Sequence, residues 1–153
     1  MGQLNLPQGC RVYIDSVVII YTLQGNLNFY ELLEPLWAKF QAGNISIFSS
    51  ELTIPEVLVS PSRTGNRDQI GIYENLLFQS GIDLVPINRE ILLLATELRV
   101  KHRLKTPDAI HAATALSINC QRFITNDRDF CNIKKLPVVI LSELLNDRSS
   151  RSS

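Results

Sequence analysis

Four acidic residues each lie at the predicted end of a strand or in the predicted first turn of a helix. Asp15 follows the run RVYI, Glu56 lies in TIPEVLV, Asp108 in TPDAIHAATAL and Asp127 in RFITNDRDF. They are too far apart in sequence to pair locally, so only the fold can bring them together. Convergent carboxylates repel one another, and a hard divalent cation is the usual reason for such a cluster. The sequence therefore predicts a site for Mg²⁺ or Mn²⁺.

Short apolar runs alternate with longer helical patterns along the chain. Runs of branched and aromatic residues predict five strands, at residues 12–14, 45–48, 83–87, 122–125 and 138–141. Apolar residues at three- and four-residue steps predict helices between the strands, and a short helix is expected after the last one. This alternation indicates an α/β fold around a parallel sheet.

Capping residues predict where several helices start. Ser16 is available to cap the first helix, and either Ser50 or Thr53 to cap the helix that carries the second acid. Asn88 precedes a long amphipathic stretch. Thr106 is followed by a proline and an acid, the order typical of a helix N-terminus.

The position of a site follows from the predicted sheet. Ligands of open parallel sheets bind beyond the carboxyl ends of the strands, where the strand order reverses. Asp15 and Asp127 follow strands and are expected at such an edge. The glycines form neither a dinucleotide-binding G-x-G-x-x-G loop nor a Walker A sequence, and no G-x-S-x-G elbow is present.

The composition indicates one folded domain. A chain of 153 residues normally forms one core, so we expect a single domain over residues 1–147 and a disordered polar tail at 148–153. Fifteen basic residues balance fifteen acidic ones, so any attraction for nucleic acid must be local. Three cysteines without a C-x-x-C pair argue against a disulfide framework or a zinc site. The absence of a recognisable signal peptide or membrane span indicates a soluble cytoplasmic protein.

Each chemical candidate also has a purely structural explanation. Asp15 could cap a helix, Glu56 could be a solvated helical residue, Asp108 could complement the helix dipole and Asp127 could form an Asx turn. Their joint placement favours the metal site. His111 shares a helix face with Asp108, and the favoured interpretation is a structural hydrogen bond rather than a contact with RNA or a metal-bound water.

The densest basic cluster lies at residues 99–105, at the end of a predicted helix. Cations there complement the helix dipole, which is the favoured explanation, and contact with phosphates is the alternative. With no net charge on the chain, RNA would be held by local cations such as this cluster, Arg122 and Arg128.

Four segments together resemble the PIN domain family. YIDSVVIIYTLQGN, TIPEVLVSP, LKTPDAIHAATAL and FITNDRDF occur in the order expected of that family, and the match as a whole spans about residues 12–141. The last two segments are the most specific. The chain is most similar to the small bacterial PIN proteins that serve as toxins in VapBC-type toxin–antitoxin pairs.

The resemblance implies a metal-dependent endoribonuclease with a three-layer α/β/α sandwich and a central parallel sheet. It implies Mg²⁺ or Mn²⁺ as cofactor, an RNA substrate, a homodimer and an antitoxin that blocks the acidic pocket. The family's four acids match Asp15, Glu56, Asp108 and Asp127, the threonine that helps hold the last loop matches Thr125, and Asp129 is a further carboxylate ranked below the four.

One position departs from the family pattern. The residue two after the first acid is often a small polar one, whereas here it is Val17, which leaves Ser16 to orient the acid or a water molecule. A non-catalytic PIN-like module that binds RNA or protein is therefore the alternative. A phosphatase is disfavoured because Val17 also removes the D-x-D pattern of its nucleophile loop.

Overall fold

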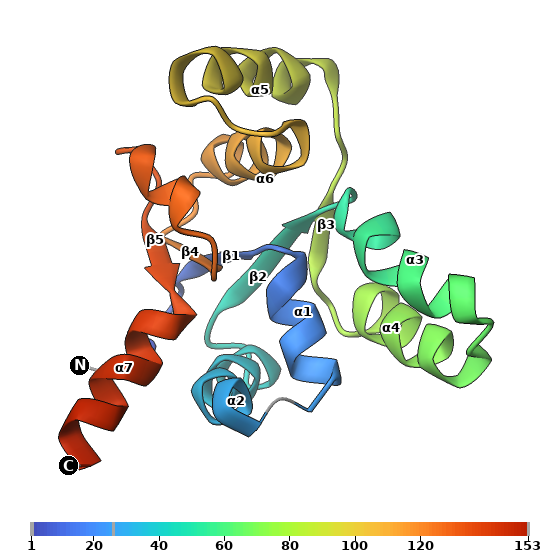
Figure 1. Cartoon of the computed structure of the whole chain (residues 1–153), viewed down its shortest axis with the longest axis vertical. Coiled ribbons are helices and arrows are strands. Elements are labelled where there is room, and N and C mark those ends of the chain that lie inside the picture. Colours follow the sequence, from blue (N-terminus) through green and yellow to red (C-terminus); the bar gives the residue numbers. More distant parts are fainter. Residues whose placement is uncertain (1, 26, 153) are drawn as a thin grey trace.

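A parallel sheet lies at the centre of the structure, a computed structural model that describes residues 2–25 and 27–152. The spatial order β3-β2-β1-β4-β5 places β1 in the middle (Figure 1). The strands are β1 (Arg11–Ile14), β2 (Ser46–Ser50), β3 (Asp83–Val85), β4 (Arg122–Thr125) and β5 (Val138–Ile140). This confirms the predicted α/β fold, and each strand forms within two residues of the expected bounds.

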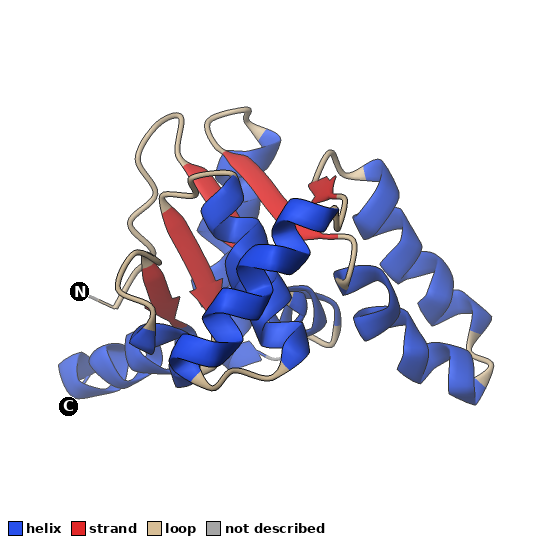
Figure 2. Cartoon of the chain, turned by 90° about the horizontal axis from the view of Figure 1, so that it is seen from above, coloured by secondary structure: helices blue, strands red, loops and turns tan. Residues whose placement is uncertain are grey.

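Helices cover both faces of the sheet, which gives three α/β/α layers (Figure 2). Helices α5 (Arg89–His102) and α6 (Thr106–Ser117) pack on one face. The other core is covered by α1 (Ser16–Leu23), α2 (Leu27–Gln41), α3 (Thr53–Thr64), α4 (Arg67–Gln79) and α7 (Leu141–Ser152). The α3–α4 hairpin projects away from the sheet (Figure 2).

The central strand supplies side chains to both cores. Val12 and Ile14 belong to the core on the α1 side, and Tyr13 between them belongs to the core under α5 and α6. All three side chains are fully buried. A strand covered on both faces reads as a continuous apolar run rather than an alternating one, which explains the sequence of β1.

Helix starts differ from the predicted caps at three places. The N-cap positions of α1, α3 and α6 are Asp15, Leu52 and Lys105, and none makes a side-chain capping hydrogen bond. Ser16, Thr53 and Thr106 are instead the first helical residues, and Ser50 accepts a hydrogen bond from the Leu52 N–H just before α3. The prediction for α5 is confirmed, because the Asn88 side chain accepts from the Ile91 N–H.

The C-terminal segment also differs from expectation. Helix α7 continues to Ser152, so the backbone of residues 148–152 is helical where a disordered tail was expected, and residue 153 lies outside the described residues. The turn after β4 contains a short 3₁₀ helix, η1 (Arg128–Asn132). No helix in residues 2–25 and 27–152 is long and apolar enough to cross a membrane.

Candidate active site

The four acids lie at the ends of four different segments. Asp15 follows β1, Asp127 precedes η1 after β4, Glu56 lies in the first turn of α3 and Asp108 in the first turn of α6. Strands β1 and β4 are neighbours although β2 and β3 separate them in sequence, so the strand order reverses between them. The first and fourth acids therefore lie at the switch point of the sheet, where such folds bind ligands.

A threonine links these two acids. Ile14 pairs with Ile124 in the sheet, which brings Asp15 level with Thr125. The Thr125 Oγ1–H donates to Asp15 Oδ2 over 2.5 Å, and the same Oγ1 accepts from the Asp127 N–H over 3.2 Å. Thr125 is fully buried, so this bridge lies inside the protein at the carboxyl ends of β1 and β4.

Asp15 is a buried carboxylate, and one of its oxygens has no hydrogen-bond partner among the described residues. The residue is only 8% exposed, and Oδ1 has no hydrogen-bond partner in the described part of the chain. Burial raises the pKa of Asp15 to about 6, against the lowering effects of the Thr125 hydrogen bond, His111 and the Val17 N–H. That N–H lowers the pKa of Asp15, although the Asp15 side chain makes no capping hydrogen bond at the start of α1. A buried, unpartnered carboxylate oxygen is costly unless a proton or cation accompanies it.

The acids also act on one another electrostatically. Burial raises the pKa of Asp108, and the nearby charge of Asp127 raises it further, with smaller contributions of the same sign from Asp129 and Glu56. The fold thus places Asp108 within electrostatic range of Asp127, Asp129 and Glu56, and Asp15 within range of Glu56. No group of three or more acidic, histidine or cysteine side chains within residues 2–25 and 27–152 is already arranged to hold a metal ion.

Glu56 is held by a buried histidine. The Glu56 Oε1 lies 2.6 Å from His111 Nε2, and the His111 Nδ1 lies 2.7 Å from the hydroxyl of Tyr13. The hydrogen-bonded role predicted for His111 is present in the structure, and its partners are a site acid and a core tyrosine. Tyr13 itself was predicted only as a core residue. The sequence signal that could have indicated its contact with His111 is its position two residues before Asp15, close to the carboxyl end of the strand.

Comparison with known proteins gives the family. The family model of the PIN domain matches residues 12–136. The chain belongs to the PIN domain family. A search of curated proteins finds no match.

Solved structures with the same fold include chains of toxin–antitoxin proteins from three bacteria. A toxin–antitoxin complex from Klebsiella pneumoniae has a TM-score of 0.66 at 24% identity, covering 85% of this chain and 97% of that one. VapBC2 from Rickettsia felis, bound to a promoter DNA fragment, gives 0.67 at 18%, covering 85% and 98%. VapC20 from Mycobacterium tuberculosis, a Sarcin-Ricin loop cleaving toxin, gives 0.65 at 14%, covering 79% and 93%. At these identities the likeness shows the fold alone, and it agrees with the α/β/α architecture predicted from the sequence.

Three residues near the four acids of this PIN domain have lesser roles in the structure. Asp129 is exposed, and its N–H donates to Asp127 Oδ1 over 2.9 Å, which shapes the loop after β4. Ser16 is half-buried at the first position of α1. Val17, the departure from the family pattern, is also half-buried and packs against the core on the α1 side.

Several basic side chains proposed for RNA are occupied elsewhere. Arg99 donates to the Leu104 carbonyl over 3.0 Å, and Arg122 to the Asn5 carbonyl over 2.9 Å. Arg128 forms an ion pair with Glu143 at 3.2 Å. These contacts favour a structural role for the three arginines.

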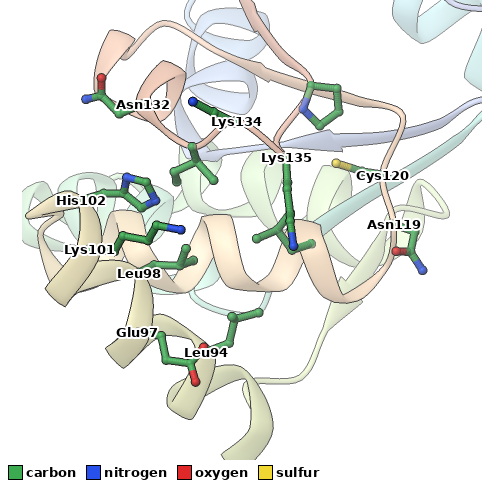
Figure 3. Close-up of a pocket in the computed structure, with 13 residues that line it drawn as sticks. Leu94, Glu97, Leu98, Lys101, His102, Asn119, Cys120, Asn132, Lys134 and Lys135 are labelled. Atoms are coloured by element: carbon green, nitrogen blue, oxygen red, sulfur yellow. The ribbon is translucent and has the colours of Figure 1, made fainter.

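A pocket with mainly basic charged side chains lies apart from the four acids in the PIN domain. This basic groove, of about 770 Å³, lies between α5, the end of α6 and residues 132–137 (Figure 3). Lys101 and His102 contribute from α5, and Lys134 and Lys135 from the segment before β5, against one acid, Glu97. The groove and the acidic cluster are connected through the chain, since η1 begins directly after Asp127 and ends at the groove.

Proposed function

We propose that this PIN domain is a metal-dependent endoribonuclease and the toxin of a VapBC-type toxin–antitoxin pair. The observation that carries the proposal is the buried Asp15, whose Oδ1 has no partner in the described residues, at a switch point shared with further acids. The structural likeness to a toxin–antitoxin complex and to a Sarcin-Ricin loop cleaving toxin supports the same assignment.

The donor set suits a hard divalent cation. Asp15, Asp108 and Asp127 offer carboxylate oxygens, with Glu56 available directly or through water, and oxygen is the ligand that Mg²⁺ and Mn²⁺ prefer. A bound ion would neutralise the carboxylates, lower the pKa of a water molecule and stabilise negative charge on the phosphate. Burial raises the pKa values of Asp15 and Asp108, and a bound cation would act in the opposite direction by favouring the charged carboxylates.

The chain's own residues prepare the site for phosphodiester hydrolysis. Thr125 holds Asp15 in place and fixes the start of the loop with Asp127, while His111 holds Glu56. In the reaction, the oxygen of water forms a bond to phosphorus, the bond from phosphorus to the 3′ oxygen breaks, and that oxygen takes up a proton. The products are a 5′-phosphate and a 3′-hydroxyl.

Cleavage of RNA by the purified protein tests the activity. We expect end-labelled RNA to be cut with Mg²⁺ or Mn²⁺, and not with EDTA or by the Asp108→Asn variant. Absence of cutting by the wild type, together with retained RNA binding, would instead favour a non-catalytic PIN module.

The basic groove is a suitable surface for the RNA backbone. The chain as a whole is neutral, yet Lys101, Lys134 and Lys135 converge there with a single opposing acid. Each phosphate contact made by a lysine releases counterions, so binding should weaken with salt.

Binding measurements on an inactive background test this surface. In Asp108→Asn protein, we expect Lys134→Ala with Lys135→Ala to weaken binding of a labelled single strand and to lower its salt slope by about 0.7 for each lost phosphate contact. Arg63→Ala with Arg67→Ala, two exposed cations near the turn between α3 and α4, is the control. Equal effects of the two double substitutions on strand binding would exclude the groove as the RNA-binding surface.

The partner proteins proposed for this chain are an antitoxin and a second copy of the chain. Large apolar side chains are exposed on α5 and on the α3–α4 hairpin, including Leu93 at 61%, Val100 at 81% and Ile72 at 54%. Apolar surface of this kind is typical of protein interfaces. Light scattering of the purified chain, alone and with its co-expressed antitoxin, measures both assemblies.

A further inference from the structure

Three side chains from three elements form a continuous hydrogen-bonded series that ends at a site acid. Glu56 comes from α3, His111 from α6 and Tyr13 from β1, and the two contacts measure 2.6 Å and 2.7 Å. Exposure falls along the series, from 27% for the Glu56 side chain to 3% for His111, and Tyr13 is fully buried. Neither His111 nor Tyr13 is accessible to a substrate as large as a nucleotide.

The chemistry of the groups sets the direction of the hydrogen bond between His111 and Glu56. A Glu56 carboxylate can only accept, so His111 Nε2 carries a proton and donates it. The other ring nitrogen, Nδ1, lies within hydrogen-bond distance of the Tyr13 hydroxyl, which can donate to it or accept from it. The series therefore holds both ring nitrogens of His111 and directs the Nε2–H at Glu56.

Tyr13 is a rigid anchor for this series. Its ring stacks on Phe123 with centroids 5.1 Å apart and an interplanar angle of 4°, and Phe123 contacts Phe130 at 4.7 Å. Glu56, by contrast, has a long side chain near the surface that would sample many rotamers if it were free. The core thus restricts the carboxylate through the imidazole, and leaves Glu56 Oε2 as the oxygen available to the site.

We propose that His111 is a positioning residue, which fixes the Glu56 carboxylate through its Nε2–H and is itself fixed by Tyr13. The inference deepens the proposed function, because Glu56 is one of the four acids of that site. Residues that orient a metal-binding or catalytic carboxylate through a hydrogen bond commonly contribute ten- to hundredfold to metal affinity or activity.

The ring nitrogens of His111 report the series without any metal or substrate. In the metal-free protein we expect the ¹⁵N resonances to show a protonated Nε2, and Tyr13→Phe and Glu56→Ala each to change the ring resonances from those of the wild type. An Nε2 without a proton, or the same resonances in both variants, would overturn the proposal.

A double-mutant cycle separates positioning from general stability. We expect Tyr13→Phe and His111→Gln each to lower kcat about ten- to hundredfold, and to have almost no further effect in a Glu56→Ala background. Tyr73→Phe, which alters a buried tyrosine of α4 outside the site, is the matched control and should leave kcat unchanged. If the loss of kcat in each double mutant equalled the product of the two single losses, the inference would be contradicted. Tyr13 and His111 would then not act through Glu56.

The two measurements also keep this inference apart from the proposed function. If the wild type cuts no RNA, the proposed activity fails, and the nitrogen resonances still decide whether His111 holds Glu56. If the wild type cuts RNA but the cycle is multiplicative, the activity stands and the positioning role is wrong.

Discussion

Two acids of the same cluster are held in opposite ways. Asp15 is 8% exposed, and one of its oxygens has no partner in the described residues. The Glu56 side chain is 27% exposed, and its Oε1 accepts from a buried histidine. Asp15 therefore has a carboxylate oxygen with no partner in the described residues that could bind a cation, whereas Glu56 is already hydrogen-bonded and oriented. We infer that metal binding depends mainly on the first acid, and alignment of the site on the second.

The largest expected effect is the loss of cleavage when a carboxylate becomes an amide. Asp15→Asn and Asp108→Asn should each abolish RNA cleavage while the protein stays folded, because each change removes a ligand and also relieves repulsion. Gel assays with labelled RNA and circular dichroism measure the two properties. Unaltered cleavage in both variants would refute the proposed site.

The same substitution should stabilise the metal-free protein. Burial raises the pKa of Asp15 from its ordinary value of 3.8 to about 6, so the folded state holds more protons between these values. The free energy of unfolding therefore falls as pH rises through this window, by up to about 3 kcal/mol. Asp15→Asn removes the penalty.

Urea denaturation in EDTA measures this effect. We expect Asp15→Asn to be more stable than the wild type at pH 8, with a smaller difference at pH 4. Asp83→Asn, at an exposed acid that begins β3, is the control and should show no such gain. A destabilised Asp15→Asn at pH 8 would mean that burial of Asp15 carries no penalty.

A smaller effect is expected from the threonine between the first and fourth acids. Thr125→Val keeps the shape of the side chain but removes the donor to Asp15 Oδ2 and the acceptor for the Asp127 N–H. We expect Mn²⁺ affinity to fall about tenfold, as for other groups that orient metal ligands. Thr96→Val, on the exposed surface of α5, is the control. Equal Mn²⁺ affinities of Thr125→Val and the wild type would show that the hydrogen bonds of Thr125 do not contribute to metal binding.

Much of this arrangement is predictable from local patterns. Asp15 comes directly after the run RVYI, and Asp127 comes two residues after the run RFIT. The strands are therefore predictable from their apolar sequence, and the carboxyl end of the sheet from the position of the acids. The His111 contacts are not predictable in this way, because they join residues 55 and 98 positions apart. Tyr13 was indistinguishable from an ordinary core residue, since its ring packs like one and only the hydroxyl differs.

The helix ends show a second limit of local patterns. Thr53 and Thr106 have the composition of N-caps, yet α3 and α6 begin one residue earlier than that role requires. Thr53 is instead fully buried, with its hydroxyl 2.8 Å from that of Ser49 in β2. A hydrogen bond to the preceding strand, four residues back in the sequence, thus takes the place of the cap. Helix α7 similarly extends through a polar segment whose composition alone predicts disorder.

Metal binding by the isolated protein tests the central claim most directly. Calorimetric titration with Mn²⁺ should show binding to the wild type, a loss of at least about a hundredfold in affinity for Asp15→Asn, and a smaller loss for Glu56→Gln. An affinity that is the same in Asp15→Asn as in the wild type would contradict the assignment of Asp15 as the principal metal ligand.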